Sequence, residues 1–233
     1  GKPVNKADSL LRYTLPNSQL TPECGKSMVE LVFPPLKLNE AIRAFSEDLK
    51  QLNIYARSEN LLVIPIEMSY TEHTPEIRNK DRYKTKLELI GEKWKRAATI
   101  HGTHIHFDSL EENNHDLINY LAQLDPIAIA LGASSNKESY LSYRTHLYRE
   151  IIHEEFPFQG RLQPLWESDT DYISRIRQEF KEFSTRHPNI SESMDEYNAV
   201  WGPVRINNKY NTTELRSLGS YPDIRIPLAL GHI

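Results

Sequence analysis

Short apolar segments along the chain have the pattern of β-strands. Runs rich in branched and aromatic residues, bounded by proline, glycine or asparagine, are typical of strands. They predict five strands: 27–33 (SMVELVF), 61–68 (LLVIPIEM), 101–108 (HGTHIHFD), 201–208 (WGPVRINN) and 212–219 (TTELRSLG). Pro65 should push the second strand toward a sheet edge or a bulge. The last two strands should pair across the asparagine-rich turn at 207–211.

Between the strands, apolar residues recur at helical spacing. After Asn39, which we expect to cap the N-terminus of a helix, the apolar positions are Ile42, Phe45, Leu49 and Leu52. Further helices are expected at 81–98, 115–133, 138–153 and 169–184, and a loop with a short helix over 185–198. Pro126 should kink its helix or divide it in two. Helices collected between two groups of strands predict an α+β fold with a largely antiparallel sheet.

Composition and charge narrow the class of protein. The 233 residues are 39% hydrophobic and 26% charged, which is typical of a folded globular chain of one or two domains. A net charge of −4 gives no electrostatic case for nucleic acid as a partner. The longest apolar runs are too short to span a bilayer, so we expect no membrane partner. A single cysteine, Cys24, and no export signal favour a reducing, cytoplasmic location.

The stretch 101–108 holds three histidines and an aspartate. On a strand, alternate side chains share a face, so His104, His106 and Asp108 point one way while Ile105 and Phe107 point toward a core. Two imidazoles on one sheet face are close enough to share a cation or an anionic ligand. A sheet face that is only wetted by solvent explains the pattern equally well.

The same alternation places ionisable groups on one face of two other strands. If these strands were neighbours in a sheet, the shared face would carry Glu30, His104, His106, Glu214 and Arg216. Carboxylates and an imidazole are suitable ligands for Mg²⁺ or Mn²⁺, and an arginine beside them suits phosphate or carboxylate oxygens. A solvated face or a structural salt bridge is the alternative for each strand taken alone.

Two other motifs are weaker. Gly25-Lys26-Ser27 looks like the end of a phosphate-binding P-loop, but Leu20 replaces the required glycine and a strand follows in place of a helix. The histidines of 101–108 could suggest a zinc hydrolase, which would also need a third strong ligand and an activating carboxylate. We reject the P-loop and retain the hydrolase as a minor alternative.

Four stretches of the chain resemble a known family. The chain is similar to the glutamate–cysteine ligases and related carboxylate–amine ligases of the glutamine-synthetase-like superfamily. The stretches, in the family's order, are ECGKSMVELVFPP (23–35), GTHIHFD (102–108), ALGASSNKESYLSYR (130–144) and VRINNKYNTTELRSLGSYPD (204–223). The most specific is TTELRSLGS, which resembles the family's E-x-R strand. The similarity spans nearly the whole chain.

The resemblance implies a fold and an activity. The fold would be a single catalytic-type domain over 1–233, with a mostly antiparallel, funnel-like sheet and helices packed on its outer face. ATP would phosphorylate a substrate carboxylate, and an amine would displace the phosphate to form an amide. ATP and Mg²⁺ or Mn²⁺ would be required, and the partners would be an amino acid or other carboxylate and an amine. The sequence is compatible with a homo-oligomer.

The resemblance also assigns roles to residues. The metal ligands would be Glu30, His104 and Glu214, with Glu23 as a weaker candidate. Arg216 and Arg205 would act in catalysis by holding the phosphate oxygens that are transferred, as phosphoryl transfer needs positioning and charge neutralisation. His106, Arg144 and Arg216 would bind nucleotide or substrate.

Two departures from the family pattern leave alternatives open. No G-x-E-x-E strand precedes Glu23, so either that strand and C-terminal elements are missing from the chain, or the protein lacks one metal site. Gly219 stands where relatives often have aspartate. A non-catalytic family member that acts as a binding or scaffold module is therefore the main alternative to a ligase.

Overall fold

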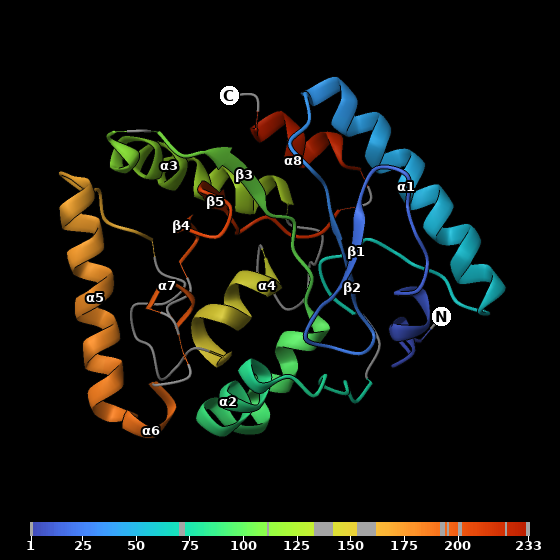
Figure 1. The fold of residues 1–233 in the computed structure, drawn as a ribbon, viewed down its shortest axis with the longest axis horizontal. Helices are drawn as coiled ribbons and strands as arrows, with labels where there is room; N and C mark the ends of the chain where they lie inside the picture. The colour runs from blue at the N-terminus through green and yellow to red at the C-terminus, as the bar shows by residue number, and fades with distance from the viewer. Residues whose placement is uncertain are drawn as a thin grey trace.

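The strands of the computed structural model form two separate antiparallel sheets with helices around them (Figure 1). The structure describes residues 2–69, 73–110, 112–132, 142–152, 162–191, 194, 196–199, 202–221 and 223–231. Over these ranges the strands are β1 Gln19–Pro22, β2 Val29–Val32, β3 Ile105–Asp108, β4 Val204–Asn207 and β5 Thr212–Leu215. The α-helices are α1 Leu38–Ser58, α2 Asp81–Ile90, α3 Asn114–Gly132, α4 Tyr143–His146, α5 Asp169–Arg186, α6 Pro188–Ser191, α7 Glu196–Ala199 and α8 Arg225–Leu230. The α+β class and the antiparallel pairing are confirmed, whereas a single funnel-like sheet is not.

The first sheet is a hairpin whose apolar face packs on α1. β1 pairs with β2 so that Leu20 lies opposite Leu31 and Thr21 opposite Glu30. Leu20 and Leu31 belong to the same core cluster as Leu52 of α1. Because side chains alternate along a strand, Thr21 and Glu30 lie on the face that points away from α1. β1 was not predicted from the sequence, and β2 pairs only with it within the described residues.

The second sheet has the strand order β3-β5-β4. Ile105 lies opposite Leu215, which lies opposite Val204 on the other side, and these side chains form a core with α3, α5 and α8. The next row across the sheet is His106, Glu214 and Arg205, which alternation places on the opposite face. The assumption that the strands of Glu30, His106 and Glu214 are neighbours holds for β3 and β5 but not for β2, which lies in the other sheet. The predicted hairpin of β4 and β5 is confirmed.

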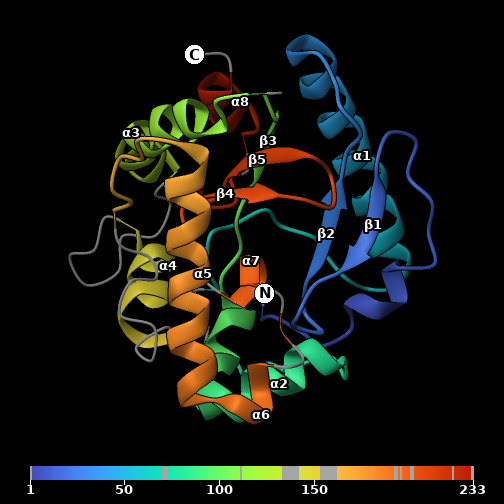
Figure 2. The same cartoon turned by 60° about the vertical axis from the view of Figure 1, so that its left-hand side comes forward.

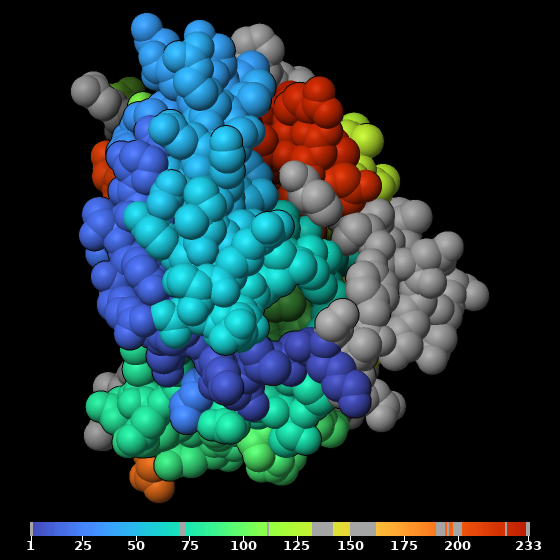
Figure 3. All heavy atoms as spheres, turned by 90° about the vertical axis from the view of Figure 1, so that its right-hand side faces the viewer, coloured from blue at the N-terminus to red at the C-terminus, as the bar shows by residue number. Residues whose placement is uncertain are grey.

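Helices shield the outer sides of the two sheets, and the polar faces are turned inward (Figure 2). α2 and the 3₁₀ helix Gly91–Thr99 close one end of the molecule through a third core cluster around Met28, Tyr83 and Trp94. On another side, α8 lies beside α1 (Figure 3). No helix within the described ranges is long and apolar enough to cross a membrane.

The segment 61–68, predicted as a strand, is not one. Only Met68 makes a β-bridge, to Ile100, and Leu62 and Ile64 have exposed fractions of 61% and 54%. The backbone N–H groups of Leu61 and Val63 donate to Ala56 O and Asn53 Oδ1 of α1. These two N–H groups are therefore bonded to helix α1 and cannot donate to a neighbouring strand.

Helix boundaries differ from the predictions where local chemistry competes with periodicity. α1 begins at Leu38, with Lys37 as its N-cap, so the prediction of Asn39 is wrong. The helix predicted over 81–98 ends at Ile90, because Gly91 adopts a φ of +72°, and continues as the 3₁₀ helix. Pro126 lies inside an undivided α3.

The remaining predicted helices follow the sequence more closely. α5 confirms the helix predicted at 169–184, and α6 and α7 fall within the predicted loop and short helix. For the helix predicted at 138–153, residues 143–152 form α4 and a π-helical segment, Ser142 is the N-cap of α4, and the remainder lies outside the described residues.

Candidate functional site

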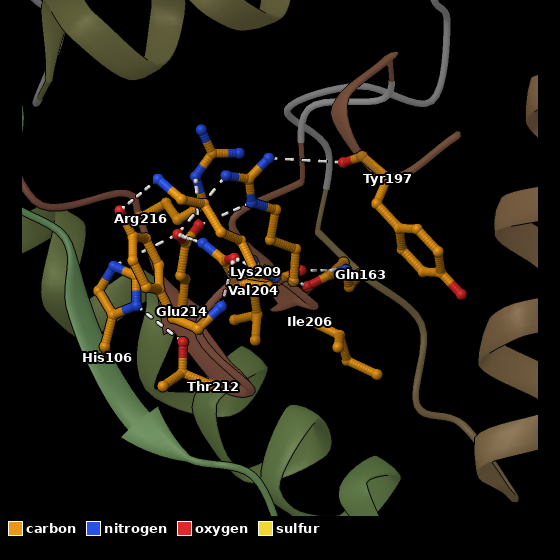
Figure 4. A network of polar contacts seen from close by, with 12 residues as sticks. His106, Gln163, Tyr197, Val204, Ile206, Lys209, Thr212, Glu214 and Arg216 are labelled. Carbon is orange, nitrogen blue, oxygen red and sulfur yellow. Dashed lines mark hydrogen bonds and ion pairs between the residues drawn. The ribbon is translucent and has the colours of Figure 1, made fainter. Parts of the chain in front are cut away.

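Glu214 is the centre of a charged row that crosses the second sheet (Figure 4). Arg205 donates from Nε to Glu214 Oε2 at 2.6 Å, and Asn207 donates from Nδ2 to Oε1 at 2.5 Å. Arg216 Nε lies 3.3 Å from Oε2, and His106 Nε2 lies 3.3 Å from Oε1. Glu214 is 2% exposed. The carboxylate therefore sits in a largely buried network supplied by all three strands.

Electrostatics keep this network ionised. Burial alone would raise the pKa of Glu214, but Arg205, Arg216 and Asn207 outweigh it and hold that pKa at about 2. Burial lowers the pKa of Arg216 to about 9, with repulsion from Arg205 acting in the same direction and Glu214 opposing it. Two guanidinium groups thus lie against one buried carboxylate.

His106 of β3, and His104 directly before that strand, are neutral at physiological pH. Burial lowers the pKa of His106, whose Nδ1 lies 2.8 Å from Thr212 Oγ1. His104 is solvent-exposed, yet the protein surrounds it enough that desolvation, helped by Arg216 and Arg144, lowers its pKa well below 6.5.

The hairpin of β1 and β2 contributes carboxylates from the other side of this site. Glu30 accepts a hydrogen bond from Thr21 Oγ1 at 2.8 Å. Burial raises the pKa of Glu30, and the nearby charges of Glu23 and Glu214 raise it further. Carboxylates from two separate sheets therefore lie within electrostatic reach of one another.

These donors fit a divalent cation only in part. A hard cation such as Mg²⁺ would relieve the repulsion between Glu23 and Glu30. Glu214, by contrast, is bound by Arg205 and Asn207, and would have to exchange a guanidinium for a metal. Among the residues that the structure describes, no three His, Cys, Asp or Glu side chains are arranged to hold a metal ion. The Glu23–Glu30 pair is therefore the part of the site suited to a metal.

Helix α2 adds two cations that the sequence analysis did not select. The pKa of Lys86 falls to about 8 because of burial and because Arg216, Arg205 and Arg82 lie nearby. Arg82 also acts on the pKa of Glu30. Residues 82 and 86 are one helical turn apart and share a face. The spacing of these two cations in a basic amphipathic helix is the sequence signal from which they could have been found.

Arg144 of α4, predicted to bind nucleotide or substrate, is buried. It is 3% exposed, and its Nη1 donates to the carbonyl oxygen of Arg216 at 2.9 Å. Its guanidinium also lies over the ring of Tyr148, 5.2 Å from the centroid. A Cβ at Gly102 would lie 2.6 Å from Arg144 Nη2, so a side chain there would force the buried guanidinium to move.

Replacing Gly102 by alanine should therefore displace Arg144 and destabilise the fold by about 1–3 kcal/mol, the range for overpacked sites. Urea unfolding measures this change. Gly231→Ala is the matched control, because a Cβ there meets its nearest neighbour at an ordinary 3.5 Å. Equal stability of the two variants would contradict the assignment of Gly102.

Arg78, also missed from the sequence, holds the turn between β1 and β2. Its Nη1 donates to the carbonyls of Glu23 and Gly25, its Nη2 donates to Met28 O at 3.0 Å, and its Nε donates to Asp8 Oδ1 at 2.7 Å. No sequence pattern links a loop arginine to carbonyls about 50 residues earlier. Arg78 thus sets the backbone from which Glu23 and Glu30 project.

A separate cavity lies away from this site. A groove of about 730 Å³ runs between α1 and α8, lined by Phe45, Leu49 and Ile224 among others. None of the predicted site residues lines it. The chemistry-bearing side chains are those around Glu214.

The fold is α+β, and acidic and basic side chains from both sheets and from α2 converge on one site. The sequence model of the glutamate–cysteine ligase family 2 matches residues 5–232, and the chain belongs to this family. The predicted family resemblance is confirmed, and membership places the chain in the carboxylate–amine ligase class. No curated protein matches the chain.

Proposed function

We propose that this protein is an ATP-dependent ligase that joins a small carboxylate to an amine through an acyl phosphate. The observation that carries the proposal is the row of Arg205, Glu214 and His106 with Arg216 beside it. One carboxylate holds two guanidinium groups in fixed positions, and such preorganised cations stabilise the charge of a transferring phosphoryl group. Family membership supports the ligase class over a hydrolase or a scaffold.

Different residues of the chain would bind the phosphate groups and the metal. Arg216 and Arg205 would contact phosphate oxygens, and Lys86 would add charge from α2. Glu23 and Glu30 would hold Mg²⁺ or Mn²⁺, which supplies charge neutralisation when bound. The neutral imidazole of His104 would offer a lone pair to a metal or a ligand hydrogen, whereas the two ring nitrogens of His106 face Thr212 Oγ1 and Glu214 Oε1.

The compartment fits the same proposal. An acyl phosphate would have to be kept from water during the reaction. The single cysteine, Cys24, is buried, and burial raises its pKa to about 12, so the thiol is unreactive. A reducing cytoplasm, where ATP is abundant, is the location we propose.

Thermal unfolding with Mg²⁺ and ATP tests the proposal. A ligand at 100 times its dissociation constant stabilises the native state by about 2.7 kcal/mol. We expect wild type to shift only when both are present, and Glu30→Gln to lose the shift. Glu92→Gln, a surface residue paired with Lys95, should shift like wild type.

The remaining outcomes identify the alternatives. Stabilisation by a metal alone, with turnover that needs no ATP, would indicate the hydrolase. A folded protein that responds to neither ligand would indicate the scaffold. Phosphate release in the presence of amino acids and amines then identifies the substrates.

A further inference from the structure

Helix α3 is apolar on all sides, but it is not buried on all sides. Between Leu117 and Gly132 it contains a single acidic or basic residue, Asp125, and that side chain is buried. A helix that is hydrophobic all round normally lies inside a protein or a membrane. α3 instead lies at the edge of the molecule (Figure 1, Figure 2), and it is not long and apolar enough to cross a membrane. Its composition therefore predicts a covering on the outer side as well.

The outer side of α3 carries a row of four large apolar residues. Tyr120, Leu124, Ile127 and Leu131 follow one another at spacings of four, three and four residues, which places them along one line of a helix. The exposed fraction is 42% for Tyr120 and 49% for both Ile127 and Leu131, and Leu124 is half-buried. This is the spacing of the apolar seam along which two helices pack side by side.

The inner side of α3 has its own set of apolar residues. Ile118, Leu121 and Ala128 are at most 1% exposed and form a core with Val204 and Leu215 of the second sheet. The fold therefore does not depend on the outer row for its core. A substitution in the outer row can change that surface without opening the core.

The loop before α5 brings a further exposed leucine to the margin of this surface. Asn119 donates to Trp166 O and accepts from Trp166 N, at 2.8 Å in each case, so the loop is fastened to α3. Leu165, which directly precedes Trp166, is 63% exposed. Asn119 in turn directly precedes Tyr120. The apolar surface thus extends beyond the helix itself.

We propose that the row Tyr120, Leu124, Ile127 and Leu131 is the contact surface between two copies of this chain, packed antiparallel about a two-fold axis. Soluble oligomers are most often symmetric dimers in which the same patch of each subunit meets the other. The spacing of the row is symmetric about its middle. In an antiparallel pair, Tyr120 therefore meets Leu131 of the partner subunit, and Leu124 meets Ile127 of the partner subunit.

Charge favours a second copy over other occupants. The exposed residues that border the row, Gln123, Pro126 and Ala130, are uncharged. A charged partner would bury groups that this face cannot pair, whereas a second copy brings an equally uncharged face. Helices that bind membrane surfaces carry lysine or arginine on their polar side, and α3 contains neither between Asn114 and Gly132. The inference does not require the ligase assignment.

Sedimentation equilibrium tests the dimer. Wild type is expected at the mass of two chains and Ile127→Glu at the mass of one, because the new carboxylate would be buried against apolar side chains with no cation to pair it. Ile54→Glu is the matched control, since Ile54 lies on α1 and is 52% exposed, and this variant should keep the mass of two chains. Far-UV circular dichroism shows that both variants are folded.

A disulfide between copies tests the antiparallel orientation. In the double variant Tyr120→Cys/Leu131→Cys, the two positions are about 16 Å apart along one helix, which is too far for a disulfide within a chain. Antiparallel packing brings them together between chains, so oxidation with copper phenanthroline should give a covalent dimer on a non-reducing gel. Each single variant should remain uncrosslinked, because the native Cys24 is buried.

Four outcomes would overturn the inference. They are a wild type that sediments as one chain, an Ile127→Glu variant that stays a dimer, crosslinking of Tyr120→Cys alone as readily as of the double variant, and a single-chain wild type that cofloats with phosphatidylcholine–phosphatidylserine vesicles. The last would indicate a membrane surface as the occupant. None of these measurements uses Mg²⁺ or ATP, so a failure of the ligase proposal is seen separately from a failure of this one.

Discussion

Replacing Glu214 by alanine should cost about 3–5 kcal/mol of unfolding free energy, the range for breaking a buried ion pair from one side. The exposed fractions of the side chains are 3% for Glu214, 12% for Arg216 and 19% for Arg205. Without the carboxylate, two guanidinium groups repel one another with little water to screen them. Urea unfolding at neutral pH measures the loss.

The same network predicts how the stability of the fold changes at acidic pH. The pKa of Glu214 is lowered from its ordinary 4.5 to about 2 in the folded protein, so its ionised form stabilises the fold above pH 4.5. That stabilisation, on the order of 3 kcal/mol, should disappear as the pH falls from 4.5 to 2. The difference in stability between wild type and Glu214→Ala should shrink over this window.

Two variants serve as controls for Glu214. Glu92→Ala removes an exposed carboxylate paired with Lys95, and should change stability by less than about 0.5 kcal/mol. Glu214→Gln keeps an acceptor for the arginines, so its stability should lie between those of Glu214→Ala and wild type. A Glu214→Ala protein as stable as wild type would mean that the arginines are not held by this carboxylate.

Arg78→Met should cause the second large loss of unfolding free energy, about 3–5 kcal/mol. The reason is that the guanidinium is 6% exposed and donates hydrogen bonds to three carbonyls and to Asp8. Each buried carbonyl that loses its donor carries its own desolvation penalty. Urea unfolding is again the measurement. Arg78→Lys should recover only part of the loss, since an ammonium cannot span carbonyls spread over the turn.

Arg177→Met is the matched control for Arg78. Its side chain is 66% exposed and its contact to Glu196 is 3.5 Å long, so little change is expected. If Arg78→Met unfolds like Arg177→Met, the turn between β1 and β2 is held by its backbone alone. Weaker Mg²⁺-dependent stabilisation in folded Arg78→Lys would further link the turn to Glu23 and Glu30.

Alternation along strands was enough to find most of the charged row. The stretches around His106 and Glu214 have apolar residues on one face and ionisable ones on the other, and both faces are as predicted. The apolar stretch 61–68 misled the same reasoning. Its composition suits a strand, but helix α1 supplies the hydrogen-bond partners, and a local pattern contains no information about neighbours.

The sequence by itself determined the α+β class, the family and the hairpin of β4 and β5. It also determined which sheet face carries His106 and Glu214. These depend on periodicity and turns, which act over a few residues. Only the tertiary structure decided that Glu214 is held by Arg205, that Lys86 joins from α2, and that Arg144 and Arg78 are buried supports. Those roles arise from contacts between segments far apart in the chain, where burial and neighbouring charges act together.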